Sequence, residues 1–197
     1  DIPTYYSDWF FNRIKEGFVL VRNPMHHRQI SRIKLTPDVV DGIVFWTKNP
    51  IPMLDRLDAL KDYMYYFQFT ITPYGKDIEP NLPTKPDEIM AAFKRLSDAI
   101  GPDRVVWRYD PILVSERYSL DYHIRAFSKI AQHLHGYTRK VTISFIDEDY
   151  HCVKSNIKEL ALLDFPTSTQ MQLSSSLADI AHSYGLKIDT CAERIEL

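Results

Sequence analysis

Polar and charged residues that could do chemistry lie at the ends of apolar, strand-like runs. Lys48 follows one such run, Arg108 and Asp110 end a second, and Ser144 stands near the end of a third. Buried parallel strands normally read as plain apolar runs, so charge at their ends is unusual. A (β/α) barrel builds its active site at the carboxyl ends of its strands. The pattern predicts an enzyme of the α/β class with its site there.

The run around Arg108 carries the sharpest local signal. Arg108 and Asp110 are two residues apart on an expected strand, so their side chains point to the same face. They form either a structural ion pair that closes the barrel mouth or a functional pair. In the functional reading, Arg108 binds an anion beside a carboxylate that positions a hydroxyl or amine. Pro111 follows, and we expect it to turn the chain out of the strand.

Two other strand ends offer polar groups with two readings each. Lys48 is either a point-charge anchor for a carboxylate or phosphate, or a lysine whose ammonium reaches solvent. Gln68 and Thr70 share one face of their strand. They either line a site or belong to a buried hydrogen-bond network, because interior polar groups must find partners.

The last expected strand also carries polar groups. Asp189 and Cys191 share a face, and Glu193 follows them. A lone cysteine at a strand end is most often a small core residue. The two acids are candidates for acid–base work with Asp110.

The histidines show no metal-binding pattern. No HExxH or similar spacing occurs. The adjacent His26 and His27 fall in an expected hairpin loop, where solvated side chains are the rule. His123, His133 and His182 fall in expected helices, and we expect them at the surface.

Bulk composition describes an ordinary globular chain. With 197 residues it is long enough for one domain with a substantial core. A net charge of −2 gives no basic excess and argues against nucleic acid as a partner. No apolar run is long enough to span a bilayer, and no signal-like start is present, so we expect a cytoplasmic protein without membrane contact. Cys152 and Cys191 form neither a local metal-ligand pair nor a disulfide framework.

Hydrophobic periodicity predicts a helix and a hairpin first. Residues 6–17 place Trp9, Phe10 and Ile14 on one face, with Gly17 as the stop. Residues 18–23 and 30–35 alternate apolar and polar side chains, which suits two short antiparallel strands.

After residue 41, strand-like and helix-like runs alternate. Strands are expected over residues 42–48, 64–72, 104–109 and 141–145 and around Ile188; helices are expected over residues 53–61, 86–100, 120–134, 157–163 and 173–184. This alternation predicts a parallel sheet with right-handed crossovers. A further strand before Asp1 would make six. The fold class predicted is therefore α/β: a single partial (β/α)6 TIM-like barrel, mostly parallel, with an N-terminal β-hairpin insertion.

The chain resembles an uncharacterised bacterial family, the domain-of-unknown-function family 1848. The resemblance rests on short stretches spread over nearly the whole chain: residues 1–3 (DIP), 6–9 (YSDW), 17–24 (GFVLVRNP), 44–50 (VFWTKNP), 66–75 (YFQFTITPYG), 104–113 (RVVWRYDPIL), 143–145 (ISF) and 190–193 (TCAE).

The resemblance implies a strand ending in Arg-Arg-Thr before the equivalent of Asp1. It also implies a cysteine cluster beyond the equivalent of Leu197, like that of radical S-adenosylmethionine enzymes, which are six-stranded partial barrels. A four-iron cluster needs three or four thiolates close together, which Cys152 and Cys191 do not supply. The expected cofactors of the full-length protein are thus a 4Fe-4S cluster and S-adenosylmethionine, with the cluster held by a C-terminal cysteine-rich segment outside this chain.

Three functions follow as hypotheses. The first is a radical S-adenosylmethionine-like enzyme body acting on a small-molecule or nucleotide-like substrate. Its expected catalytic residues are Lys48, Arg108, Asp110 and Glu193. Its expected cofactor-binding residues are Gln68, Thr70, Ser144, Asp189 and Trp107, with Trp46, Trp107 or a tyrosine stacking on adenine.

The second hypothesis is a cofactor-free or metal-assisted barrel hydrolase or lyase. It would use Asp110 with Glu193 or Asp189 as the acid–base pair, and Arg108 or Lys48 as the anion clamp. The third is a non-catalytic module that binds a nucleotide or nucleic acid through residues 26–32, which requires a basic face and a salt-dependent affinity.

Overall fold

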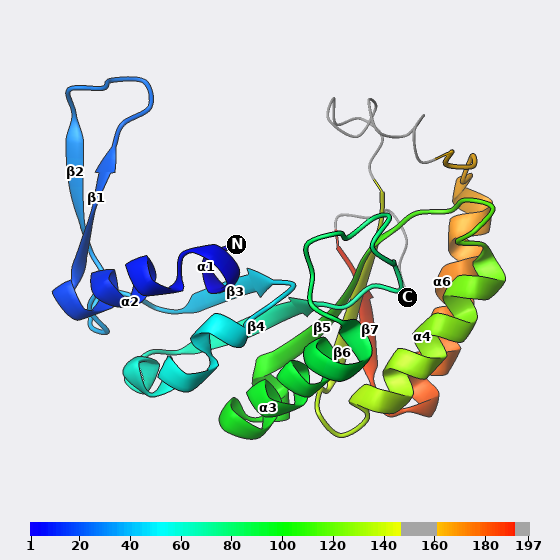
Figure 1. Cartoon of the computed structure of the whole chain (residues 1–197). Coiled ribbons are helices and arrows are strands. Elements are labelled where there is room, and N and C mark those ends of the chain that lie inside the picture. Colours follow the sequence, from blue (N-terminus) through cyan, green and yellow to red (C-terminus); the bar gives the residue numbers. More distant parts are fainter. Residues whose placement is uncertain (147–160, 192–197) are drawn as a thin grey trace.

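The computed structural model describes residues 1–146 and 161–191. Two sheets organise it: a two-stranded antiparallel ribbon near the N-terminus and a five-stranded parallel sheet that forms the body (Figure 1). The predicted α/β class and the N-terminal hairpin are confirmed.

The five-stranded sheet has the order β3-β4-β5-β6-β7, so each strand lies beside the next one along the chain. Its strands are β3 (Ile43–Thr47), β4 (Tyr65–Thr70), β5 (Val105–Ile112), β6 (Lys140–Phe145) and β7 (Lys187–Thr190). All four pairings are parallel, as the alternation predicted. Among the described residues the sheet is open and does not close into a barrel. The expected sixth strand, before Asp1, lies outside the chain.

One face of the sheet packs on the helices and holds the core. Phe67 and Phe69 of β4 and Trp107 of β5 are fully buried on this face. Trp107 stacks on Phe127 with ring centres 4.6 Å apart, and Phe69 stacks on Phe93 at 5.1 Å. Because side chains alternate along a strand, this apolar face leaves the intervening residues for the opposite face.

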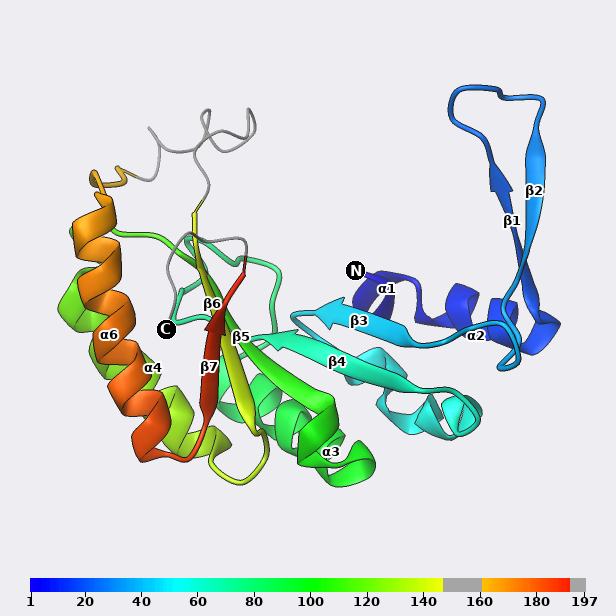
Figure 2. The ribbon, with the colours of Figure 1, turned by 180° about the vertical axis from the view of Figure 1, so that it is seen from behind.

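The covering helices follow the strands in order: η1 (Ile51–Leu60), η2 (Lys85–Ile89), α3 (Met90–Ile100), η3 (Pro102–Arg104), α4 (Leu120–Leu134) and α6 (Thr167–Ser183). Figure 2 looks onto β5, β6 and β7 from the other side, where no described helix lies in front of them. We call this the open face of the sheet.

The N-terminal region stands beside β3. The short helices α1 (Ile2–Tyr5) and α2 (Ser7–Glu16) lead to Gly17, whose φ of 73° ends α2 in the left-handed conformation that glycine adopts without strain. The strands β1 (Phe18–Arg22) and β2 (Ile30–Lys34) then form the ribbon, which projects away from the body (Figures 1 and 2).

Several local expectations are corrected. The helix expected over residues 53–61 is a 3-10 helix, and a turn of π-helix precedes α3. β5 continues through Pro111 to Ile112, with a cis bond after Asp110 and a register shift, so Pro111 does not end the strand. Most of the helix expected over residues 157–163 lies outside the described residues. In the part described, no helix is long and apolar enough to cross a membrane.

Candidate functional site

Polar side chains from β4, β5, β6 and β7 lie on the open face, next to the indole of Trp46 from β3. The strand register places Trp46 of β3 beside Gln68 of β4. One step further along the strands, a row crosses four of them: Thr70, Arg108, Thr142 and Asp189 are successive partners. Residues that are adjacent in register share a face, so Thr70, Arg108 and Asp189 lie on one face together with Thr142, which the sequence analysis did not single out.

Arg108 is the centre of the row and has little access to solvent. Its side chain is 5% exposed. Nε donates a hydrogen bond of 2.8 Å to Oδ2 of Asp110, Nη2 donates to the same oxygen over 2.5 Å, and Nη1 donates to Oε1 of Gln68 over 2.6 Å. The guanidinium carbon lies 4.7 Å from the centre of the Trp46 ring. Arg108 is thus fixed on three sides.

The same network fixes the Asp110 carboxylate. Its Oδ1 accepts a hydrogen bond from the Ser144 hydroxyl, while Oδ2 accepts from Arg108. Burial alone would lower the pKa of Arg108, but hydrogen bonds to Cys191 and Asp110 outweigh it and raise that pKa. The guanidinium therefore carries its charge at every physiological pH, and it forms an ion pair with Asp110.

The groups of this face that are accessible to a ligand are the indole of Trp46 and the carboxylates of Asp110 and Asp189. The Trp46 residue is 56% exposed, and the side chains of Asp110 and Asp189 are 22% and 44% exposed. Asp189 accepts a hydrogen bond of 2.6 Å from Thr142 and pairs with Lys140. Arg108 is buried against Trp46 and Asp110, so it positions these two groups rather than offering itself to an anion.

Lys48, the second expected anion anchor, is also paired. Its ammonium contacts the buried carboxylate of Glu79, which the loop after β4 supplies. Glu79 pairs with Lys85 as well, and both its oxygens accept from Thr72 Oγ1 at 3.0 Å. Burial alone would raise the pKa of Glu79, but the two ammonium groups outweigh it and hold that pKa below its usual range.

Lys85 is the more deeply buried lysine of this cluster. Its ammonium donates to the carbonyl oxygens of Thr72, at 2.8 Å, and Tyr74, at 2.6 Å, in addition to Glu79. Burial lowers its pKa, and the attraction of Glu79 only partly opposes this. Because every N–H already has an acceptor, Lys85 ties the loop together and does not offer a nucleophile.

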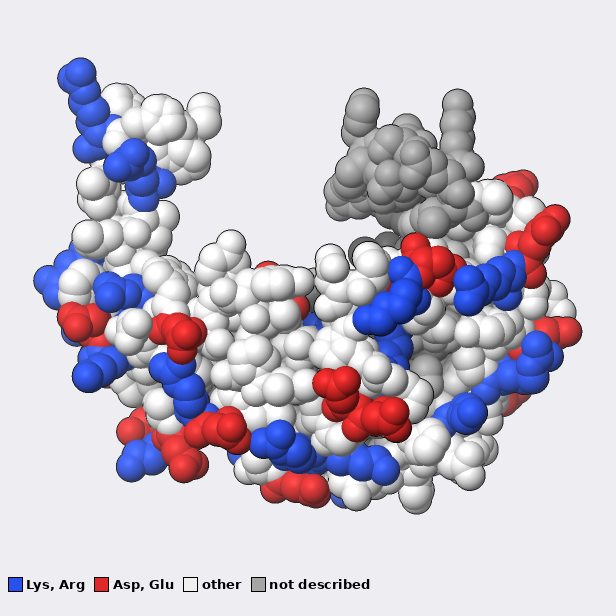
Figure 3. All heavy atoms as spheres, in the orientation of Figure 1, with Lys and Arg blue, Asp and Glu red and all other residues white. Residues whose placement is uncertain are grey.

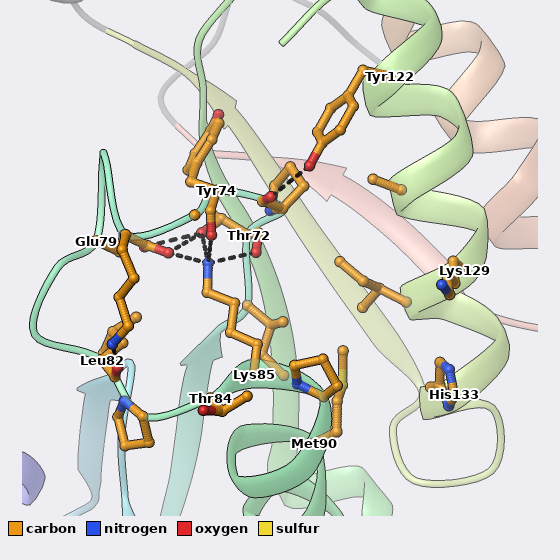
Figure 4. A pocket seen from close by; sticks show the side chains of 18 residues that line it. Thr72, Tyr74, Glu79, Leu82, Thr84, Lys85, Met90, Tyr122, Lys129 and His133 are labelled. Carbon is orange, nitrogen blue, oxygen red and sulfur yellow. Dashed lines mark hydrogen bonds and ion pairs between the residues drawn. The ribbon is translucent and has the colours of Figure 1, made fainter. Parts of the chain in front are cut away.

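A cavity of about 730 Å³ opens on the other side of this cluster, between the loop after β4, η2 and α4 (Figure 4). It belongs to the helix side of the sheet. Its walls are mostly apolar, and Lys129 and His133 from α4 stand on the wall opposite Lys85. Tyr122 fixes one wall by donating to the carbonyl of Pro73 over 2.8 Å.

His123 is buried, so the expectation that it lies at the surface is wrong. Its residue exposure is 0%. Nε2 lies 2.8 Å from the Leu113 carbonyl and must donate to it, so Nδ1 accepts from the Tyr109 hydroxyl, also at 2.8 Å. Burial lowers the pKa of His123, with the Leu113 hydrogen bond partly opposing it. The ring is a neutral link between β5 and α4.

The remaining expected site residues do not lie on the open face in the part of the chain that the structure describes. Trp107 points into the helix-side core and donates its indole N–H to the Ile71 carbonyl over 3.0 Å. This corrects the expectation that it lines a cavity with Arg108: an odd-numbered residue of β5 cannot share a face with Arg108. Glu193 and Cys152 lie outside the described residues.

Sequence reasoning missed Glu79, Lys85 and Thr72. Their loop carries no strand pattern, and nothing local shows that Glu79 reaches Lys48. The only available signal was the alternation of charge in a stretch rich in proline and glycine, which is typical of any solvated loop.

The described residues do not fit an iron–sulfur cluster. Among them Cys191 is the single cysteine, and they contain no group of three His, Cys, Asp or Glu side chains able to hold a metal ion. A four-iron cluster requires several thiolates.

Comparison with known proteins gives a family and no activity. The family model described as a domain of unknown function, DUF1848, matches residues 1–197. Neither the curated proteins nor the solved structures contained a match. Because the family model covers the entire length, the chain belongs to the family of domains of unknown function called DUF1848.

Proposed function

We propose that the open face of the sheet is the active site of an enzyme and that it binds S-adenosylmethionine in a radical-enzyme-like partial barrel. The observation that carries the proposal is the convergence of polar side chains from four parallel strands, and of the Trp46 ring from the fifth, around a buried and fully paired Arg108. A polar network of this kind inside a sheet face is costly unless it has a use.

The chemistry of the exposed groups supports a positively charged nucleoside as ligand. Both cations that could have clamped an anion, Arg108 and Lys48, are already paired with carboxylates. An exposed indole stacks well on a purine and attracts a sulfonium cation. The partly exposed carboxylates of Asp110 and Asp189 can accept hydrogen bonds from an amine or from ribose hydroxyls.

In this proposal the described residues bind and orient. Trp46 stacks on the base, Asp110 receives the ligand's ammonium, and Arg108 with Gln68 and Ser144 keeps Asp110 in place. When bound, the cofactor supplies the reactive group, which the full-length protein would generate with a cluster held outside this chain, as the resemblance implies.

The direct test is binding of S-adenosylmethionine to this chain, measured by calorimetry, beside the analogue sinefungin, which replaces the sulfonium by an amine-bearing carbon. Binding that is lost in Asp110→Asn and Trp46→Ala supports the proposal. The absence of binding to the folded chain at millimolar ligand would overturn it.

The radical reading has a separate test on the natural gene product. We expect the protein, reconstituted with iron and sulfide without oxygen, to be brown and to cleave S-adenosylmethionine to 5′-deoxyadenosine. A colourless protein with activity that does not depend on cysteine would replace this reading by the barrel hydrolase, with Asp110 and Asp189 as the acid–base pair.

A further inference from the structure

The ribbon formed by β1 and β2 is the least covered part of the described chain. Every residue of β2 is exposed, and Val21, Ile30 and Ile33 are between 43% and 56% exposed. The ribbon stands clear of the body, on the side toward which β6 and β7 point (Figures 1 and 3). A free two-stranded hairpin is only marginally stable in water, so this element calls for a specific use.

Charge separates the ribbon from the rest of the molecule. Residues 18–34 hold four of the chain's 24 Lys and Arg and none of its 26 Asp and Glu, which gives the segment a formal charge of +4. The remaining residues then hold 20 against 26, a charge of −6, so the chain's net −2 conceals two regions of opposite sign. The overall charge therefore does not describe the charge of the ribbon.

The strand register places the cations on one face. Leu20 pairs with Arg32 and Arg22 pairs with Ile30, so Arg22 and Arg32 project from the same face of the ribbon. The guanidinium carbon of Arg32 lies 4.0 Å from the centre of the Phe18 ring, which holds it flat. Lys34 lies 3.6 Å from Asp38 at the base of the ribbon, so the three arginines, Arg22, Arg28 and Arg32, are the cations left without an acidic partner among the described residues.

The tip of the ribbon is polar and internally tied. Asn23 donates through its amide to Gln29 Oε1 at 2.8 Å and accepts from the backbone N–H of Met25 at 2.9 Å. His26, His27 and Arg28 are exposed in this turn. Because the loop is fixed by its own hydrogen bonds, it presents these donors with little ordering cost.

We propose that this ribbon binds the phosphodiester backbone of a nucleic acid. A region with cations, histidines and no carboxylate is complementary to a polyanion. A two-stranded β-ribbon also has the width that the major groove of B-form DNA admits, so duplex DNA is the form we expect to bind first. A hairpin that enters a membrane would collect its apolar residues at the tip; here only Met25 is apolar there, apart from Pro24. This inference concerns binding alone and does not depend on the reaction proposed above.

The test is binding of the full chain to a fluorescent 20-base-pair duplex, measured by anisotropy at salt concentrations from 50 to 200 mM. Three phosphate contacts predict a slope of about −2.7 in log K against log salt, or about a 40-fold loss of affinity over this range. Arg22→Gln, Arg28→Gln and Arg32→Gln together should weaken binding more than tenfold at 50 mM salt and flatten the slope.

The matched control removes three exposed cations of the body, Lys61→Gln, Arg125→Gln and Lys129→Gln, and should bind as the wild type does.

Each other outcome would overturn the proposal. Equal losses in both triple variants would show unspecific attraction to the body. No binding by the wild type at 50 mM salt, with an unchanged circular dichroism spectrum, would exclude a nucleic-acid role. Preferential binding to phosphatidylserine vesicles would assign the ribbon to a membrane, and a dimer abolished by Ile33→Ser without DNA binding would assign it to a second copy. Single-stranded DNA and duplex RNA of the same sequence, compared with duplex DNA, identify the form of the backbone that is bound.

Discussion

Arg108 and Asp110, two residues apart on β5, bind each other through two hydrogen bonds to one oxygen, Oδ2 of Asp110, at 2.8 Å from Nε and 2.5 Å from Nη2. The pairing holds the guanidinium of Arg108 in the buried part of the face, where its side chain is 5% exposed. As a result, the open face presents an indole and carboxylates, although its central residue is an arginine.

Removing the Asp110 charge should destabilise the fold. Asp110→Asn leaves the guanidinium of Arg108, which is 5% exposed, without its counter-ion. Breaking a buried pair from one side costs about 3–5 kcal/mol, and we expect about 2–3 kcal/mol because Asp110 is partly exposed. Urea unfolding measures the loss. Asp189→Asn is the control: the exposed pair with Lys140 should contribute about 1 kcal/mol or less. Equal effects of the two changes would contradict this account.

Trp46 should carry much of the ligand binding. We expect Trp46→Ala to weaken binding of S-adenosylmethionine about tenfold, because stacking of a base on an aromatic ring contributes about 1–3 kcal/mol. Calorimetry gives the affinity. Trp9→Ala is the control, since Trp9 is 48% exposed but lies on α2. Equal affinities of the wild type and of Trp46→Ala for S-adenosylmethionine would show that the indole does not contact the ligand.

Stability should fall in acid because of Glu79. The folded-state pKa of Glu79 lies below its unfolded value, so its contribution is complete above the unfolded pKa and is lost as pH falls through the folded one. Glu79→Gln should destabilise the protein at pH 7 by about 3 kcal/mol, because Lys48 and Lys85 lose their shared partner. It should also lose less stability than the wild type between pH 5 and pH 3.

The exposed Asp87 provides the comparison for Glu79. Asp87→Asn should leave both the stability at pH 7 and the acid dependence almost unchanged, since Asp87 is exposed in the first turn of η2. Urea titrations at several pH values give the unfolding free energies of the wild type and of the two variants, and these are compared. A Glu79→Gln variant with wild-type acid dependence would show that other carboxylates govern it.

His123 gives a second pH dependence, at higher pH. Its folded pKa lies below the ordinary histidine value of about 6.5, so its contribution is present above that value and is lost as pH falls toward the folded pKa. Proton NMR of the ring should show a neutral Nε2–H tautomer at pH 7. Chemical shifts that indicate an imidazolium at pH 7 would contradict the hydrogen-bond assignment.

The sequence determined the elements and the facing of their residues. Period-two alternation in β4 separated Gln68 from Phe67, because successive side chains of a strand point to opposite faces. The same alternation separates Arg108 from Trp107 in β5, which the expectation that Trp107 lines the site overlooked. Gly17 and the alternating segments after it likewise determined the ribbon, whose antiparallel pairing needs only local contacts.

Only the tertiary structure decided which charges meet. Glu79 reaches Lys48 over 31 residues of sequence, and His123 finds Tyr109 through the packing of α4 on β5. Such pairings depend on how loops and helices return to the sheet, which no local pattern records. The tertiary structure also decided whether Arg108 can bind an anion. Its residue type indicates an anion binder, but it is buried beside Asp110 and Trp46 and holds these two side chains in place. Charge type is a property of the chain, whereas exposure and pairing are properties of the fold.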